Sequence, residues 1–280
     1  MAKALKPVIA RVKVDGYSVV TYSYGSGDEV LFLLNGGPGL PCNYLREPLI
    51  ALADQGFRVV TYDQLGCGRS DKPTDKSLWN ISRYVEEVET VLRALDLPPV
   101  HLLGHSWGGW LGIEFALTYL GSIRTLILSN TCGDMPHLVS ELNRLRGALG
   151  SETVAMMQRY EALGQFDHPA YKGAITVLNY RHVLRLDVAP KPAHDSLKDW
   201  NRIPDMHRIT VPTLVMCGQH DEMTPVCAMR MQRALPDAEI TVFPNSSHMP
   251  IYEEADAYLA RLTKFLGQHR RKKSAARRRG

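Results

Sequence analysis

The chain has 280 residues, of which 45% are hydrophobic and 22% charged, a composition that excludes a disordered or fibrous protein and is typical of a globular one. Its formal net charge of +4 misleads, because the last eleven residues hold seven of the 33 basic side chains and no acid, so the remainder is slightly acidic. We interpret that end as a solvated basic tail, with an arm for nucleic acid or an anionic surface as the alternative.

The cysteines are odd in number, widely spaced and without a CxxC pair, which predicts free thiols in a reducing compartment (Cys42, Cys67, Cys132, Cys217 and Cys227). The N-terminal segment lacks the apolar core of a secretory signal, and no run of 18 uncharged apolar residues occurs. We therefore expect a cytoplasmic protein with no membrane partner and no nucleic-acid partner. The oligomeric state is left open.

Strands are predicted at 8–14 and 17–24, joined at Asp15-Gly16, a dipeptide that favours a tight hairpin. A strand at 29–35, a glycine-proline loop, a helix near 44–55 and a strand at 57–63 follow. Apolar residues then recur at helical spacing over 81–95, before a strand at 98–105, a helix at 107–119 and a strand at 123–130. This alternation predicts an α/β fold with a mostly parallel sheet and an antiparallel start.

The alternation stops at about residue 133, where a helix-rich and then proline-broken stretch runs to 204. It resumes with a strand at 211–218, a helix after Pro225, a strand at 238–243 and an amphipathic helix from about 252 to 266. We expect a core made of residues 1–132 and 206–268, a helical cap inserted at 133–205, and a basic tail at 269–280.

The most specific motif is a G-x-S-x-G placed between a strand and a helix, Gly104-His105-Ser106-Trp107-Gly108. Glycines two before and two after the serine allow a tight turn that exposes its hydroxyl at the carboxyl edge of the sheet. This context predicts the nucleophile of an α/β-hydrolase fold, whereas a serine in an ordinary turn is the alternative.

A serine hydroxyl needs a base, and the base needs an orienting acid, in the chain order serine, acid, histidine on this fold. Asp221 comes three residues after the strand ending at 218, and His248 five residues after the strand ending at 243. The triad is therefore expected to be Ser106, Asp221 and His248. Its rivals, expected to line or support the site instead, are Glu222, His220 and His105.

The loop of residues 35–39, NGGPG, follows a predicted strand and leaves its backbone N–H groups unobstructed. The N–H groups of Gly37 and Trp107 are expected to form an oxyanion hole, with Gly36 lining the substrate. A plain turn is the alternative. A phosphate cradle is not predicted, because the lysine and hydroxyl of a P-loop are missing. No metal-ligand spacing or nucleotide motif occurs, so no metal or cofactor is predicted.

Five segments together carry a family resemblance: NGGPG at 35–39, YDQLGCGRSD at 62–71, LLGHSWGGWLGIEFA at 102–116, CGQHDEMTP at 217–225 and NSSHMP at 245–250. The chain resembles the proline iminopeptidase family of serine aminopeptidases, especially its tricorn-interacting aminopeptidases and L-amino-acid amidases. Segments 140–145 and 180–187 of the cap share the likeness. The resemblance implies a small peptide, amide or ester substrate and removal of an N-terminal proline or small apolar residue. From the residues alone, the loop at 62–71 is a scaffold in which Asp63 and Arg69 pair.

An aminopeptidase must bind a protonated amine, which calls for carboxylates near the nucleophile. In the family branch, a glutamate directly after the catalytic aspartate does this, and it matches Glu222. A second family glutamate, in a Gly-Pro-Asn-Glu-Phe setting before the segment KDW, has no match here. Glu141, Asp187 or Asp195 of the cap are candidates to replace it. The alternatives are a carboxylesterase, thioesterase or amidase acting on acyl substrates without a free amine, and a non-catalytic receptor that keeps the hydrolase shell.

Overall fold

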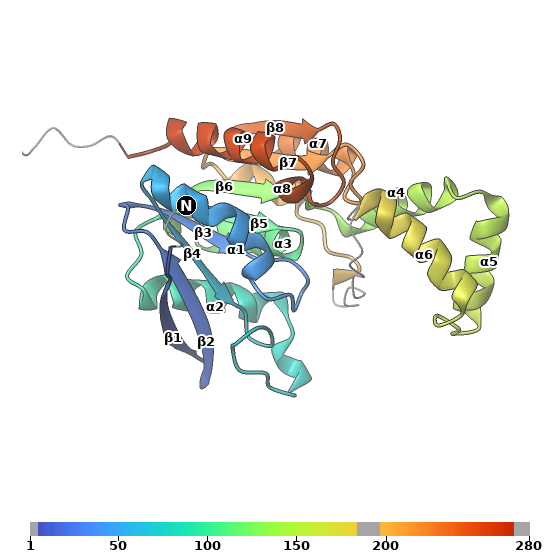
Figure 1. The fold of residues 1–280 in the computed structure, drawn as a ribbon, viewed down its shortest axis with the longest axis horizontal. Helices are drawn as coiled ribbons and strands as arrows, with labels where there is room; N and C mark the ends of the chain where they lie inside the picture. The colour runs from blue at the N-terminus through green and yellow to red at the C-terminus, as the bar shows by residue number, and fades with distance from the viewer. Residues whose placement is uncertain (1–4, 184–196, 272–280) are drawn as a thin grey trace, which may run out of the picture.

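The computed structural model describes residues 5–183 and 197–271. Eight strands form one sheet in the order β1-β2-β4-β3-β5-β6-β7-β8 (Figure 1). Their bounds are Val8–Val14 for β1, Tyr17–Tyr24 for β2, Glu29–Leu34 for β3, Phe57–Asp63 for β4, Val100–His105 for β5, Ile123–Ser129 for β6, Thr213–Gly218 for β7 and Ala238–Phe243 for β8. The predicted strands are confirmed to within two residues at each end.

The sheet is antiparallel at its start and parallel from there on, as predicted. β1 pairs antiparallel with β2, and β2 antiparallel with β4, whereas β4, β3, β5, β6, β7 and β8 pair in parallel. Asp15 and Gly16 both have positive φ, 51° and 84°, which is the twist that a two-residue hairpin needs. The parallel strands therefore all end at one edge of the sheet.

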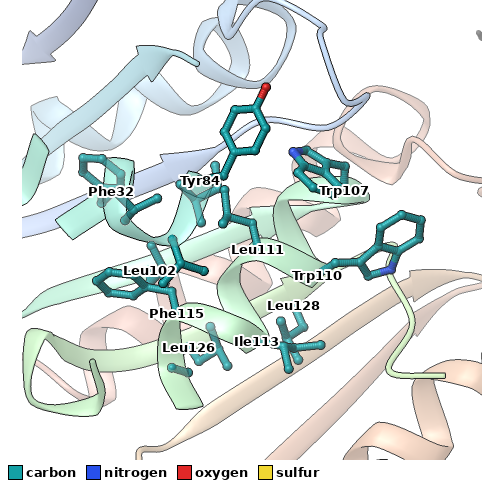
Figure 2. Close-up of a cluster of buried hydrophobic side chains, with 14 of the residues drawn as sticks. Phe32, Tyr84, Leu102, Trp107, Trp110, Leu111, Ile113, Phe115, Leu126 and Leu128 are labelled. Atoms are coloured by element: carbon teal, nitrogen blue, oxygen red, sulfur yellow. The ribbon is translucent and has the colours of Figure 1, made fainter. Parts of the chain in front are cut away.

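Helices cover both faces of the sheet, which explains why every residue of β3 and of β5 is buried. The first core lies under α2 (Ile81–Ala94), α3 (Trp107–Thr118) and α7 (Pro225–Ala234). Figure 2 shows Phe115 of α3 beside Leu102 of the sheet, and Trp107 of α3 lies next to Tyr84 of α2. The second core lies under α1 (Asn43–Leu49) and α9 (Ala255–Gln268). The strands that end at the functional edge are thus packed against helices on both faces.

Two predicted helices are each divided in the structure. The helix expected at 44–55 is α1 followed by a 3-10 helix, η1 (Ile50–Gln55), and Pro48 inside α1 has no N–H with which to continue the ladder. The helix expected at 252–266 is α8 (Pro250–Glu253) and α9, separated at Glu254. The glutamate carboxylates at this break bond the loop before them, Glu253 to Ser247 and Glu254 to Ser246.

Among the described residues between β6 and β7, three α-helices project away from the sheet (Figure 1): α4 (Met135–Gly147), α5 (Ser151–Ala162) and α6 (Pro169–His182). A partly buried polar contact ties the returning chain to the core, because Glu114 of α3 accepts hydrogen bonds of 2.6 Å from both Trp200 Nε1 and Arg202 Nε. Within the described ranges, none of the helices combines the length and the apolar character that a membrane crossing requires. Most of the expected basic tail lies outside the described residues.

Candidate active site

Ser106 occupies a strained turn between β5 and α3. Its backbone has φ 56° and ψ −121°, a left-handed conformation that costs a non-glycine residue about 1–3 kcal/mol. The Ser106 N–H donates to the Ser129 carbonyl over 3.0 Å, and its own carbonyl accepts from the Thr131 hydroxyl over 2.9 Å. These bonds hold the turn in place and leave the side chain partly accessible to solvent.

The glycines flanking Ser106 are required by close packing, as expected from the motif. A Cβ on Gly104 would lie 2.2 Å from the Gly108 carbonyl oxygen, and a Cβ on Gly108 would lie 2.1 Å from the Leu34 carbonyl oxygen. No side chain fits at either distance. The turn can form only because both positions lack one.

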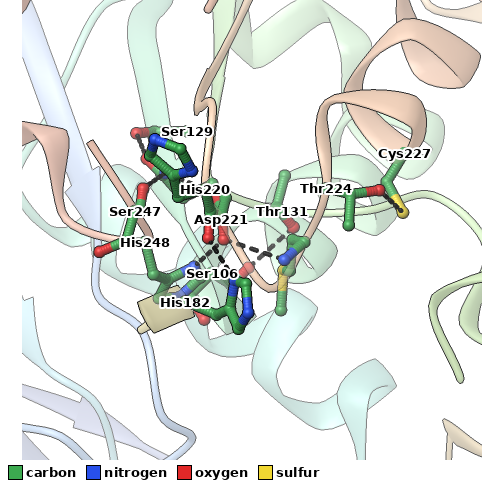
Figure 3. A network of polar contacts seen from close by, with 12 residues as sticks. Ser106, Ser129, Thr131, His182, His220, Asp221, Thr224, Cys227, Ser247 and His248 are labelled. Atoms are coloured by element: carbon green, nitrogen blue, oxygen red, sulfur yellow. Dashed lines mark hydrogen bonds and ion pairs between the residues drawn. The ribbon is translucent and has the colours of Figure 1, made fainter. Parts of the chain in front are cut away.

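Asp221 and His248 lie in the loops after β7 and β8, at the edge of the sheet where β5 also ends. The His248 Nδ1–H donates to Asp221 Oδ1 over 2.8 Å, and both side chains are buried (Figure 3). The Met223 N–H donates to the same carboxylate oxygen over 2.9 Å. The structure thus brings together the acid and the base named from the sequence.

Burial lowers the pKa of His248, but the acidic groups around it, of which Asp221 contributes most, together outweigh burial and raise the pKa from 6.5 to about 9. Glu222 and Glu253 act in the same direction. An imidazole with a raised pKa is a strong base, and its protonated form is stabilised by the carboxylate that it faces. These are the properties expected of a general base that becomes imidazolium during acyl transfer.

A chain of buried hydrogen bonds supports the Asp221 carboxylate from behind. Tyr258 Oη donates to Ser129 Oγ over 3.1 Å, Ser129 Oγ donates to Asn130 Oδ1 over 2.8 Å, and Asn130 Nδ2 donates to Asp221 Oδ2 over 2.7 Å. The sequence analysis missed Asn130 and Tyr258. The available signal for Asn130 was its place one residue after β6, at the same edge as the nucleophile.

The rival histidines are placed away from the role of base. His220 is exposed, and its backbone alone bonds the surrounding loop. His105 is buried directly before the turn, and its ring bonds Tyr44 and the carbonyl of His248. Among the described residues, no side chain is hydrogen-bonded to the Ser106 hydroxyl, His248 included. Contacts of this kind are often long in a free enzyme and tighten when substrate binds.

The glycine loop after β3 packs against the turn that carries Ser106. A Cβ on Gly36 would lie 2.8 Å from the Tyr44 hydroxyl and 3.1 Å from Ser106 Cβ. Gly37 has φ 123°, a conformation open to glycine. Within residues 5–183 and 197–271, no group accepts a hydrogen bond from the Gly37 or Trp107 N–H. Both donors are therefore available beside the serine.

Glu222 is half-buried next to the triad, and its carboxylate has no hydrogen-bond or ion-pair partner in the described part of the chain. Burial raises the pKa of this carboxyl and Asp221 raises it further, while His248 lowers it. The end of α6 fixes its backbone, because the Glu222 N–H donates to the His182 carbonyl over 2.9 Å and His182 Nδ1–H donates to the His220 carbonyl over 2.8 Å. The end of α6 therefore rests on the Asp221 loop, a contact the sequence analysis did not identify.

Of the cap carboxylates expected near the substrate, Glu141 is described and Asp187 and Asp195 lie outside the described residues. Glu141 Oε2 accepts hydrogen bonds of 2.8 Å from both Arg144 and the Thr224 hydroxyl, and the Arg144 bond lowers the pKa of the Glu141 carboxyl. Its charge is therefore already compensated by Arg144. The carboxylate joins α4 to the start of α7.

The scaffold role expected of the 62–71 loop takes a different form from the expected side-chain pair. The Asp63 carboxylate accepts from the backbone N–H of Arg69 over 2.9 Å, from the Tyr22 hydroxyl over 2.9 Å and from the Cys42 N–H over 3.1 Å. No ion pair joins Asp63 to the Arg69 guanidinium in the described residues. A buried carboxylate surrounded by fixed donors is satisfied without a second charge.

Residues 31–261 match the alpha/beta hydrolase family. The chain is 35% identical over 272 residues to the proline iminopeptidase of Saccharolobus solfataricus, covering 88% of this chain and 87% of that protein. It is 34% identical to the proline iminopeptidase of Heyndrickxia coagulans, covering 86% and 91%. Among solved structures, the proline iminopeptidase of Mycobacterium smegmatis superposes with a TM-score of 0.86 at 29% identity, covering 94% of this chain and 98% of that one.

Proposed function

We propose, on the premise that this chain belongs to the alpha/beta hydrolase family and to its proline iminopeptidases, that it is a serine aminopeptidase with the triad Ser106, Asp221 and His248. Its substrates are peptides or amides with a free N-terminal proline or small apolar residue. Glu222 holds the substrate ammonium group. The expected location is the cytoplasm, which is supported by the five buried cysteines, because none of them forms a disulfide.

In this mechanism the Ser106 hydroxyl attacks the carbonyl carbon of the N-terminal residue while His248 Nε2 takes the hydroxyl proton. The N–H groups of Gly37 and Trp107 donate to the oxyanion that forms, and one such donor contributes about 3–4 kcal/mol of transition-state stabilisation. His248 then passes the proton to the leaving amine. Water, deprotonated by His248, hydrolyses the acyl-enzyme and restores the serine.

The observation that carries the aminopeptidase proposal is the Glu222 carboxylate. It lies beside His248, is half-buried, and has no partner among the described residues, whereas Glu141 is bound to Arg144 and Thr224. A partly desolvated carboxylate is stabilised by pairing with an incoming cation, because the attraction between the charges offsets the free-energy cost of desolvating the carboxylate. A substrate ammonium group supplies that cation at the correct end of a peptide.

The test compares prolyl p-nitroanilide, its N-acetyl derivative and p-nitrophenyl acetate as substrates of the native protein and of Glu222→Gln. We expect Glu222→Gln to lose at least tenfold in kcat/KM on prolyl p-nitroanilide, since a charge-assisted bond contributes roughly 1.5–3 kcal/mol. Turnover of p-nitrophenyl acetate is expected to stay within about threefold. The matched control is Glu152→Gln, which makes the same change on an exposed position of α5.

Two results would contradict the assignment. Equal losses on the anilide and the ester would show that Glu222 acts in the chemistry or the folding of the site. Equal turnover of the free and N-acetylated anilides by the native protein would show that no amine is recognised, which is the behaviour of the esterase alternative.

A further inference from the structure

A hydrogen-bonded chain joins the glycine loop to the loop of the catalytic histidine through two residues that have no role in the mechanism above. The Gly36 N–H donates to Tyr44 Oη over 2.6 Å, and Tyr44 Oη lies 3.0 Å from His105 Nδ1. On the other side of the same ring, His105 Nε2 lies 3.2 Å from the His248 carbonyl oxygen.

The chemistry of the two ends fixes the direction of every bond in this chain. A carbonyl oxygen only accepts, so His105 Nε2 carries the proton and donates to His248. Burial and the neighbouring His248 lower the pKa of His105 to about 3, so the ring is neutral and its Nδ1 carries no proton. Tyr44 therefore accepts from Gly36 and donates to His105. The side chains at positions 44 and 105 must therefore each accept one hydrogen bond and donate another.

The chain is anchored at points outside the site. Tyr252 Oη donates to the carbonyl of Tyr44, the carbonyl that Pro48 cannot bond because it lacks an N–H. The Cys42 N–H at the start of α1 is held by Asp63. Both contacts position the α1 helix, and with it the Tyr44 hydroxyl, against the buried His105 ring, whose centroid lies 5.6 Å from that of Tyr44.

We infer that Tyr44 and His105 are positioning residues that set the oxyanion loop and the His248 loop relative to each other. By occupying the Gly36 N–H, Tyr44 leaves the Gly37 N–H as the loop's donor to the oxyanion. By bonding the His248 carbonyl, His105 fixes the backbone from which the base reaches Ser106. The inference rests on the proposed triad and oxyanion hole, but it is independent of which acyl group is cleaved.

The experiment uses Tyr44→Phe, His105→Leu, the double variant and His105→Gln, with kcat and KM measured on prolyl p-nitroanilide and p-nitrophenyl acetate. Active sites are counted by fluorophosphonate labelling, so that partial misfolding does not enter kcat. We expect each of Tyr44→Phe and His105→Leu to lower kcat about 10- to 100-fold with KM within about threefold, because small displacements of reacting groups carry losses of this size. Tyr119→Phe is the control, since it removes the hydroxyl of a tyrosine at the end of α3 that bonds Glu86 of α2, outside the site.

Because Tyr44 and His105 belong to one hydrogen-bonded chain, the kcat of the double variant is expected to lie within about threefold of the kcat of the slower single variant. His105→Gln is expected to recover at least tenfold over His105→Leu, since the glutamine amide can accept from Tyr44 and donate to His248. Losses that multiply in the double variant, or a glutamine variant as slow as the leucine variant, would overturn the inference. If the native protein hydrolyses p-nitrophenyl acetate but not prolyl p-nitroanilide, the aminopeptidase proposal is refuted. The roles of Tyr44 and His105 are then still tested by the rates of the same variants on the ester.

Discussion

The side-chain amide of Asn130 donates a 2.7 Å hydrogen bond to Asp221 Oδ2, while His248 bonds the other oxygen of the same carboxylate. Asn130 has φ 51° and its N–H donates to the Met216 carbonyl over 2.8 Å, so the backbone aims the amide from a left-handed position that asparagine tolerates. The carboxylate is thus fixed by groups in the loops after β6 and β8, and it in turn orients the imidazole.

Replacing Asn130 by glycine is expected to lower kcat/KM on prolyl p-nitroanilide about 10- to 100-fold. Glycine adopts the left-handed backbone without strain, so the variant removes the amide and the roughly 1.5–3 kcal/mol of a hydrogen bond to a charged group. Asn130→Ala is the comparison, because it loses the same bond and adds backbone strain. We expect the two to share the kinetic loss and Asn130→Ala to be less stable to urea. Asn130→Gly with native kinetics would show that the amide does not orient Asp221.

Gly108→Ala and Gly112→Ala place the same methyl group on one helix, α3, with opposite expected outcomes. A Cβ at Gly108 would lie 2.1 Å from the Leu34 carbonyl oxygen, whereas a Cβ at Gly112 meets its nearest atom, on Leu126, at 3.6 Å. We expect Gly108→Ala to lose several kcal/mol of unfolding free energy, or to fail to fold. Gly112→Ala is expected to be neutral or to gain roughly 0.5–1 kcal/mol from helix propensity. Urea unfolding of both variants decides, and equal midpoints would contradict the packing argument.

The strands and the triad could be predicted from the sequence because local patterns determine both. Strands buried on two faces are continuous apolar runs, and the glycines around Ser106 mark a turn that tolerates no side chain. The acid and the base follow from the fold, since each stands a few residues after a parallel strand and all such strands end at one edge. The family membership then supplied the class of substrate.

The residues that support the site could not be predicted, because their partners are remote in the sequence. Asn130 and Asp221 are 91 positions apart, and Tyr44 and His105 are 61 apart. The place of Asn130 directly after β6 puts it at the same sheet edge as Ser106, but nothing in composition or periodicity indicates which side chains bond each other in either pair. The break at Glu254 has a different origin, because it depends on contacts with the nearby loop before α8, which the helical spacing of apolar residues does not indicate. Each of these features is determined by side-chain hydrogen bonds that exist only in the folded chain.

The rate on prolyl p-nitroanilide is expected to depend on pH through a bell-shaped curve with two separate causes. The proton must leave His248 before it can act as base, so kcat/KM rises with pH toward the pKa of about 9. The substrate ammonium group, with a pKa of about 8 in an N-terminal residue, must stay protonated to pair with Glu222, which lowers kcat/KM at high pH. On p-nitrophenyl acetate, which has no amine, the rising limb alone is expected.

Glu222→Gln sharpens this test, because Glu222 is one of the groups that raise the pKa of His248. Removing its charge is expected to move the rising limb on p-nitrophenyl acetate to lower pH. The measurement is the pH dependence of kcat/KM for both proteins, corrected for spontaneous ester hydrolysis. A limb that moves to higher pH, or that stays in place, would show that Glu222 does not face the base.

His105 gives the fold a specific sensitivity to acid. Burial lowers the pKa of its imidazole from 6.5 to about 3, so the unfolded chain binds a proton that the folded chain does not accept. Stability from this group is therefore complete above pH 6.5 and is lost as the pH falls toward 3, at a rate of at most about 1.4 kcal/mol per pH unit. His105→Gln removes the titrating group and is expected to keep both hydrogen bonds, while His101, which is also buried and has a lowered pKa, titrates in both proteins. Urea unfolding at pH 7, 6 and 5 is expected to show the variant gaining on the native protein as the pH falls, and unfolding free energies that decline in parallel would contradict a buried, neutral His105.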